Sequence, residues 1–256
     1  MFRRFERSQV YHPTREWDAD PADLGRPFED VHFAASDGVR LNAWFFPADA
    51  ASLRARFVVL VCHGNGGNIS HRLLLTRSLL QTGANVLQFD YRGYGRSEGE
   101  PSEEGTYLDA QAAYHWLRER GLAAQHIIAF GESLGGAVAC ELALRERVGG
   151  LVLQSTFTSI ADVGAELFPW LPVRWLHRIK YDTLKKLPRV RAPVLAMHSR
   201  NDGLIRFHHA EKNFAAANEP KLFCETIGAH NDSLNSDHDS NIAGMEKFLA
   251  LVEKNG

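Results

Sequence analysis

The turn Gly131-Glu132-Ser133-Leu134-Gly135 constrains the fold of this chain more than any other sequence feature. It follows the apolar run Ile127–Phe130, which is typical of a buried strand, and precedes a helical pattern. Glycine on both sides lets a helix leave close to its strand, where a side chain would collide. The serine at the apex is forced into a strained backbone conformation that lifts its hydroxyl above the strand ends. The turn therefore predicts a strand, a sharp bend, a helix and a nucleophilic Ser133.

A serine hydroxyl needs a base to remove its proton and an acid to orient that base. The apolar run Val194–His198 leads into a loop that carries Asp202, and the run Leu222–Ile227 leads into a loop that carries His230. Each residue thus follows the carboxyl end of an expected strand. The sequence predicts Ser133 as nucleophile, His230 as base and Asp202 as the orienting acid.

Asp232 is the rival for the role of the acid. It lies only two residues after His230, so its carboxylate would have difficulty reaching the far ring nitrogen, whereas Asp202 arrives from a neighbouring strand. The alternative is that Ser133 and Asp202 are ordinary turn residues and His230 is structural.

Two more segments accompany this serine, acid and histidine order: His63-Gly64-Asn65-Gly66-Gly67-Asn68 and Asp90-Tyr91-Arg92-Gly93-Tyr94-Gly95-Arg96-Ser97, each after an expected strand. From about Val31 to the last helix, the chain resembles the α/β-hydrolase superfamily. It looks most like the branch of serine-aminopeptidase-like hydrolases and acyl-protein depalmitoylases. The resemblance implies a mostly parallel, doubly wound sheet of about eight strands, a short lid between strands six and seven, and no required cofactor.

The resemblance also implies an oxyanion hole, in which two backbone N–H groups stabilise the negative charge that develops on the substrate oxygen. One donor is the residue after the nucleophile, Leu134, at a helix N-terminus. The other is Asn65, with Gly64 and Gly66 allowing close approach and His63 supporting the loop. An ordinary glycine-rich turn is the alternative, and the Gly-Lys-Ser/Thr of a phosphate-binding loop is missing.

Strand and helix patterns alternate along the chain, which indicates a doubly wound sheet. The expected strands are Val31–Ala34 and Arg40–Phe46, joined as an antiparallel pair, followed by Phe57–Cys62, Ala84–Phe89, Ile127–Phe130, Leu151–Gln154, Val194–His198 and Leu222–Ile227. Helices are expected near 71–82, 106–120 and 241–253, the second starting at a capping box formed by Thr106 and Asp109.

Composition narrows the class of function. The 256 residues, 45% of them hydrophobic, can bury one core, and no linker divides them, so we expect one domain over residues 1–256. A net charge of −2 without a basic aromatic stripe argues against nucleic acid, so the expected partner is a small molecule. An odd count of three cysteines and no signal or membrane-spanning segment predict a cytoplasmic protein. The sequence sets no oligomeric state.

The lid, about residues 155–187, carries aromatic side chains near two prolines. We expect Phe157, Phe168, Trp170 and Trp175 to line an apolar pocket for an acyl chain. The alternative is that they only pack the lid onto the sheet. The basic residues that follow could face a membrane or an anionic substrate, or form a solvated surface.

Metal binding is not predicted. The clusters His208-His209-Glu211 and Asp237-His238-Asp239 lack the spacing of a closed site and are expected to be solvated surface.

The sequence therefore predicts a serine hydrolase that cleaves carboxylic esters or thioesters through an acyl-enzyme on Ser133. An aminopeptidase is the nearest alternative, because Asp162 and Glu166 in the lid could anchor an α-ammonium group. A non-catalytic protein that binds an apolar ligand on the same fold is the other.

Overall fold

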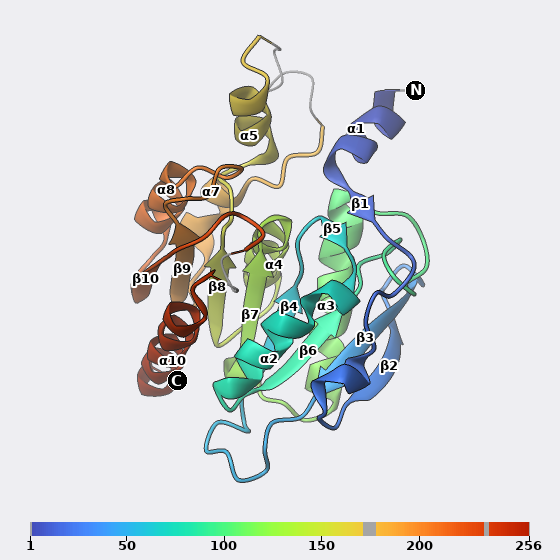
Figure 1. Cartoon of the computed structure of the whole chain (residues 1–256), viewed down its shortest axis with the longest axis vertical. Helices are drawn as coiled ribbons and strands as arrows, with labels where there is room; N and C mark the ends of the chain where they lie inside the picture. Colours follow the sequence, from blue (N-terminus) through green and yellow to red (C-terminus); the bar gives the residue numbers. More distant parts are fainter. Residues whose placement is uncertain (1, 171–177, 233–235, 256) are drawn as a thin grey trace.

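A mostly parallel sheet of eight strands forms the centre of the molecule, in the order β10-β9-β8-β7-β4-β6-β3-β2 (Figure 1). The computed structural model describes residues 2–170, 178–232 and 236–255. The strands are β2 (Glu29–Ala34), β3 (Arg40–Phe46), β4 (Val58–Cys62), β6 (Asn85–Phe89), β7 (Ile127–Glu132), β8 (Gly150–Gln154), β9 (Val194–Ser199) and β10 (Lys221–Thr226). Only the pairs that include β3 are antiparallel. The predicted α/β-hydrolase sheet is confirmed.

Helices cover both faces of the sheet (Figure 1). One face packs against α3 (Glu103–Glu119) and α4 (Leu134–Arg145), and the other against α2 (Leu73–Gln81) and α10 (His238–Asn255). Because side chains alternate along a strand, Leu60 of β4 joins the first hydrophobic cluster and its neighbour Val59 joins the second. The central strands are therefore buried on both faces, which explains their nearly continuous apolar sequence.

The capping box predicted at Thr106 and Asp109 is wrong. Helix α3 begins three residues earlier, and the Ser102 hydroxyl accepts a hydrogen bond from the backbone N–H of Gly105 at 3.1 Å. Thr106 and Asp109 are fully buried within the helix, where the Asp109 carboxylate binds the guanidinium of Arg92 at 2.8 Å. The serine is the better cap because it stands where the chain is still extended.

The N-terminal segment contains two elements that no sequence pattern indicated. Helix α1 (Phe2–Val10) leads into the short strand β1 (His12–Pro13), which pairs in parallel with β5 (Gly66–Gly67) outside the main sheet. Figure 1 shows β1 beside β5, at the end of the molecule where the carboxyl ends of the central strands lie. The residues of β1 therefore lie against the predicted oxyanion loop.

The predicted lid follows β8 and precedes β9. It contains α5 (Ile160–Leu167) and α7 (Thr183–Lys186), and α5 projects from the body of the molecule (Figure 1). The remaining elements are α8 (His208–Ala216) and the 3₁₀ turns Pro21–Leu24, Ile69–Arg72, Ala124–His126 and Leu187–Arg189. The assignment of residues 1–256 to one domain stays a prediction.

Within the described ranges, no helix is both long and apolar enough to cross a membrane. All three cysteines, Cys62, Cys140 and Cys224, are free thiols.

Candidate active site

The sharp turn between β7 and α4 holds Ser133 in a backbone conformation that only a few non-glycine residues adopt. Its φ is 52° and its ψ is −113°, as the sequence pattern predicted for a strained serine. The backbone N–H of Ser133 donates to the carbonyl of Gln154 in β8 at 2.8 Å, which fixes the turn to the neighbouring strand. The hydroxyl thus stands at the carboxyl edge of the sheet.

Glycine is required in this elbow because backbone passes backbone there without room for a side chain. A Cβ on Gly131 would overlap backbone atoms of Gly135 and Gly136. A Cβ on Gly135 would overlap the carbonyl oxygen of Cys62 at the end of β4. The elbow is therefore held by close packing against the start of α4 and the end of β4.

Ser133, His230 and Asp202 form one hydrogen-bonded line. The Ser133 Oγ lies 3.0 Å from His230 Nε2, and His230 Nδ1 lies 2.7 Å from Asp202 Oδ2. Ser133 is 8% exposed and Asp202 is 4% exposed. The rival acid, Asp232, accepts a hydrogen bond from the Ser236 hydroxyl at 2.7 Å. With Nδ1–H donating to Asp202, the lone pair of Nε2 faces the serine proton, which is the arrangement a general base needs.

The carboxylate of Asp202 is fixed by its own loop. Its Oδ1 accepts the backbone N–H groups of Leu204 and Ile205 at 3.0 and 2.8 Å, which leaves Oδ2 for His230. Burial alone would raise the pKa of Asp202, but the hydrogen bond and charge of His230 outweigh it and lower the pKa below its usual value. Asp202 is therefore ionised at neutral pH and can stabilise an imidazolium.

A second histidine, His198, lies beside the same carboxylate. Its Nε2 donates to the carbonyl of Ile205 at 2.8 Å and stands 3.4 Å from Asp202 Oδ2. Burial lowers the pKa of His198, so it is neutral and adds no charge to the site. These contacts hold the loop that carries Asp202.

The predicted oxyanion donors come from the two segments that the sequence named. Leu134 begins α4, so its N–H has no acceptor within the helix. His63 Nδ1 donates to the carbonyl of Gly64 at 2.7 Å, and this fixes the peptide plane whose other end is the N–H of Asn65. Burial lowers the pKa of His63 to about 3, so the ring stays neutral. The role of Asn65 and Leu134 as donors stays a prediction.

An ion pair next to the nucleophile escaped the sequence reasoning. Arg72 Nε donates to Glu132 Oε2 at 2.9 Å, and Arg72 Nη2 donates to the carbonyl of Gly66 at 3.0 Å. Glu132 immediately precedes Ser133, so this arginine bridges the elbow and the oxyanion loop. The carboxylate of Glu132 inside the glycine turn indicated that a basic partner was needed, but nothing in the sequence identified Arg72 as that partner.

A buried acid also supports the loop. Asp90 Oδ1 accepts the backbone N–H of Ile69 at 2.9 Å and lies 3.7 Å from His63 Nε2. Burial raises the pKa of Asp90 to about 7. This carboxyl group is thus poised to change charge near neutral pH.

The residues predicted to line an acyl pocket do not lie together: one is buried in the core and two are exposed on the lid. Phe157 is 3% exposed within the core, whereas Phe168 and Trp170 are 43% and 74% exposed at the end of α5. Trp175 lies outside the described residues. The two exposed rings meet edge to face, 5.9 Å between centroids. Their contact with substrate stays a prediction.

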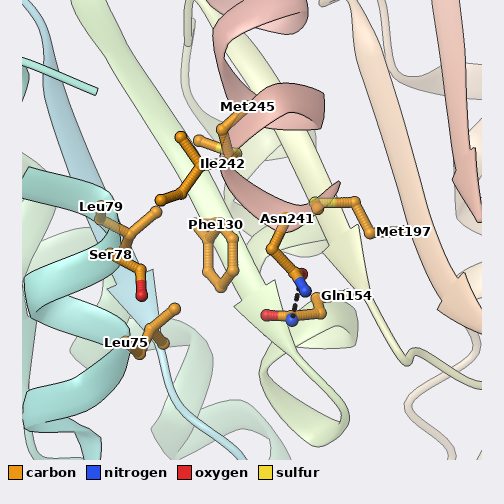
Figure 2. A pocket seen from close by; sticks show the side chains of 9 residues that line it. All are labelled: Leu75, Ser78, Leu79, Phe130, Gln154, Met197, Asn241, Ile242 and Met245. Carbon is orange, nitrogen blue, oxygen red and sulfur yellow. Dashed lines mark hydrogen bonds between the residues drawn. The ribbon is translucent and has the colours of Figure 1, made fainter. Parts of the chain in front are cut away.

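A small cavity lies on the face of the sheet that packs against α2 and α10, between these helices and the central strands (Figure 2). Figure 2 shows Gln154 and Asn241 hydrogen-bonded at its edge, with Phe130 and aliphatic or thioether side chains around them. The Gln154 amide donates to Asn241 Oδ1 at 3.1 Å. Its volume of about 10 Å³ has room for one water molecule and no substrate.

The prediction that His208 and His209 belong to a solvated surface is wrong for His209, which is 1% exposed. Glu166 from the lid lies 2.9 Å from His208 and 3.3 Å from His209, so three groups with ligand atoms meet here. However, the N–H of Thr158 donates to His209 Nδ1 at 3.1 Å. The same Nδ1 lies 2.9 Å from the Thr158 hydroxyl, so two groups of Thr158 hold the His209 ring. Glu166, His208 and His209 therefore bring the lid helix α5 against α8.

Comparison with known proteins agrees with this geometry. Residues 58–180 match the family model described as the alpha/beta hydrolase fold. An uncharacterized protein of Mycobacterium tuberculosis is 38% identical over 95% of this chain and 87% of its own length. The alpha/beta hydrolase domain-containing protein WAV2 of Arabidopsis thaliana is 32% identical over 98% of this chain and 90% of its own. The chain belongs to the α/β-hydrolase family.

The likeness extends to solved structures. An esterase of Pyrococcus furiosus superimposes with a TM-score of 0.78 at 23% identity, covering 94% of this chain and 98% of the esterase. At that identity, the match supports the fold. The finer branch within the family, serine-aminopeptidase-like or depalmitoylase-like, stays a prediction.

Proposed function

We propose that this α/β-hydrolase cleaves carboxylic esters or thioesters through an acyl-enzyme on Ser133. The observation that carries the proposal is the hydrogen-bonded line from Ser133 Oγ through His230 to Asp202, with the serine strained at a helix N-terminus. A binding protein for an apolar ligand has no use for a base aligned on a hydroxyl. The line therefore favours catalysis over binding.

The mechanism follows from the atoms in that line. Ser133 Oγ attacks the substrate carbonyl carbon while its proton passes to His230 Nε2, and the carbonyl electrons move to oxygen. The N–H groups of Asn65 and Leu134 stabilise this oxyanion. When the intermediate collapses, the alcohol or thiol leaves with the proton from Nε2, and the acyl group remains on Ser133.

Water then completes the reaction. His230 Nε2 takes a proton from a water molecule that attacks the acyl carbonyl, and returns it to Ser133 Oγ as the carboxylic acid departs. Asp202, ionised because His230 lowers its pKa, stabilises the imidazolium in both half-reactions. The chemistry needs no cofactor.

The hydrogen bonds of the two lid acids, Asp162 and Glu166, favour an acyl ester over a substrate with a free α-ammonium group. Asp162 Oδ2 accepts the hydroxyls of Thr158 and Ser159, both at 2.8 Å. Glu166 is paired with His208 at 2.9 Å. An α-ammonium group would have to displace these bonds, whereas an acyl chain near Phe168 or Trp170 would only remove apolar surface from water.

One purified sample, tested on p-nitrophenyl esters, acyl thioesters and aminoacyl arylamides, decides between these substrates. We expect the esters or thioesters to give the higher kcat/KM and Ser133→Ala to remove turnover of all three. A higher kcat/KM for the arylamide would replace the esterase with an aminopeptidase. Turnover that survives Ser133→Ala would remove the acyl-enzyme mechanism.

A further inference from the structure

The N-terminal segment Val10–Glu16, which we name the strap, lies along the oxyanion loop and binds it through backbone hydrogen bonds. The N–H of His12 donates to the carbonyl of Asn65 at 3.0 Å, and the N–H of Thr14 donates to that of Gly67 at 3.1 Å. In return, Asn65 Nδ2 donates to the carbonyl of Val10 at 3.0 Å. Both the main chain and the side chain of Asn65 are thus tied to a segment more than fifty positions away.

A tyrosine from a third segment completes the clamp. The Tyr94 hydroxyl donates to the same Asn65 carbonyl at 2.8 Å, and the Tyr94 side chain is fully buried. Further along the loop, Asn68 Nδ2 donates to Thr14 Oγ1 at 2.9 Å. Loop, strap and tyrosine therefore form one hydrogen-bonded unit, in which both Asn65 and Asn68 of the loop bind the strap.

The start of the strap and helix α1 before it are anchored at the base of the lid. The Glu6 carboxylate, on a residue 5% exposed, accepts the backbone N–H of Ile179 at 3.0 Å. The Tyr11 hydroxyl meets that of Tyr181 at 3.0 Å between buried side chains. Both anchors are buried, so the chain is fixed to the lid where it enters the strap.

The glycines of the loop explain why such a clamp is needed. A Cβ on Gly66 would meet nothing within 4 Å, and Gly67 has a φ of 79°. At Gly66 the loop is thus not held by steric contact, whereas a Cβ on Gly67 would come within 2.9 Å of the His71 ring. Glycines also raise the conformational freedom of the loop. An oxyanion donor must nonetheless be fixed before reaction, since a misplacement of about 1 Å can cost on the order of a hundredfold in rate.

We propose that the strap and Tyr94 are positioning elements of the active site, which hold the N–H of Asn65 where the oxyanion forms. This inference rests on the proposed function. None of the hydrogen bonds described for the strap involves Ser133, His230 or Asp202, so it acts through the loop. Its loss should affect the transition state more than substrate binding.

The experiment compares two substitutions at one exposed residue. His12→Pro removes the N–H that binds Asn65, whereas His12→Ala removes the side chain and keeps that N–H. Tyr94→Phe removes the second donor, and Tyr114→Phe is its matched control, because Tyr114 donates to the carbonyl of Arg147 at 2.8 Å elsewhere. Each variant is assayed for kcat and KM on a short acyl ester and for inhibition by a trifluoromethyl ketone, which forms an oxyanion on the serine.

We expect His12→Pro and Tyr94→Phe to lower kcat about fivefold to tenfold and to weaken the ketone in parallel, with KM within about twofold. His12→Ala and Tyr114→Phe should match wild type. If His12→Pro and Tyr94→Phe, folded by thermal melts, keep the kcat of their controls, the strap has no positioning role. Should His12→Pro not fold, Tyr94→Phe decides alone.

The proposed function fails in a different way. A wild-type protein without turnover or ketone inhibition would overturn the hydrolase and, with it, the strap's role. If wild type is active and both His12→Pro and Tyr94→Phe keep the kcat of their controls, only the positioning role of the strap is overturned.

Discussion

The elbow and the oxyanion loop are both rich in glycine, but they are held in place in different ways. In the elbow, a Cβ on Gly135 would overlap the backbone of Cys62, so close packing with the adjacent strand fixes the turn. In the oxyanion loop, a Cβ on Gly66 would meet open space, and hydrogen bonds from His12 and Tyr94 hold the chain instead. We call the elbow the local half of the site, because five consecutive residues of the sequence mark it. We call the oxyanion loop the distant half, because no local pattern marks the residues that hold it.

The largest expected effect breaks the local half. Gly135→Ala places a methyl group against the Cys62 carbonyl and should lower the free energy of unfolding by at least about 3 kcal/mol, with loss of activity. Gly66→Ala is the control and should unfold within about 1 kcal/mol of wild type, because its Cβ has space. Urea unfolding measures both. Equal losses in the two variants would show that the elbow is not the more tightly packed turn.

The second prediction removes one charge from the triad. Asp202→Asn keeps the size of the side chain but removes the carboxylate 2.7 Å from His230 Nδ1, so kcat should fall at least roughly a hundredfold, against about ten-thousandfold for the same change in a serine protease. Asp232→Asn is the control and should cost much less. Thermal melts must show that both variants are folded. An active Asp202→Asn beside a folded but inactive Asp232→Asn would mean that the acid is misassigned.

A smaller effect concerns the buried acid that supports the oxyanion loop. Because burial raises the pKa of Asp90 to about 7, the folded protein keeps a proton that the unfolded chain releases near pH 4. Stability should therefore fall by about 2 kcal/mol in all as pH rises from 5 to 7, and the slope lessens near pH 7 because Asp90 then ionises in the folded protein too. Asp90→Asn does not ionise and lacks this contribution. Urea unfolding at pH 5 and pH 7 should show wild type losing about 2 kcal/mol more than the variant, and parallel curves would contradict the raised pKa.

The smallest effect tests the link between the two halves. Glu132→Gln removes the charge that pairs with Arg72 at 2.9 Å, so the oxyanion loop should shift slightly and kcat should fall about threefold with KM unchanged. Glu141→Gln is the control, since it removes a comparably buried acid that pairs with Arg145 and Lys186. A change in KM alone would assign Glu132 to substrate binding.

The same contrast explains what the sequence could predict. The eight strands follow from apolar runs and the elbow from local glycine spacing, so both were predictable. Ser133, Asp202 and His230 were predicted as catalytic residues because each follows a strand end, and the structure brings them together. The distances between them came only from the structure.

The distant half left little trace in the sequence. The strap binds through main-chain groups of His12 and Thr14, which any residue except proline could supply, so no side-chain pattern marks it. Arg72 carries no motif either. His209 was predicted to be solvated because its cluster lacks the spacing of a closed metal site, but it is buried and Glu166 of the lid helix lies 3.3 Å from it. Tertiary contacts of this kind do not follow from local sequence.

The central claim is that Ser133 is an activated nucleophile, and covalent labelling tests it most directly. A fluorophosphonate should add one adduct to the intact protein, located on Ser133 by peptide mass spectrometry, because phosphorus is attacked as a carbonyl would be. Ser133→Ala should stay unlabelled. If wild type takes no label, or Ser133→Ala labels equally, Ser133 is not the nucleophile and the hydrogen-bonded line does not serve acyl transfer.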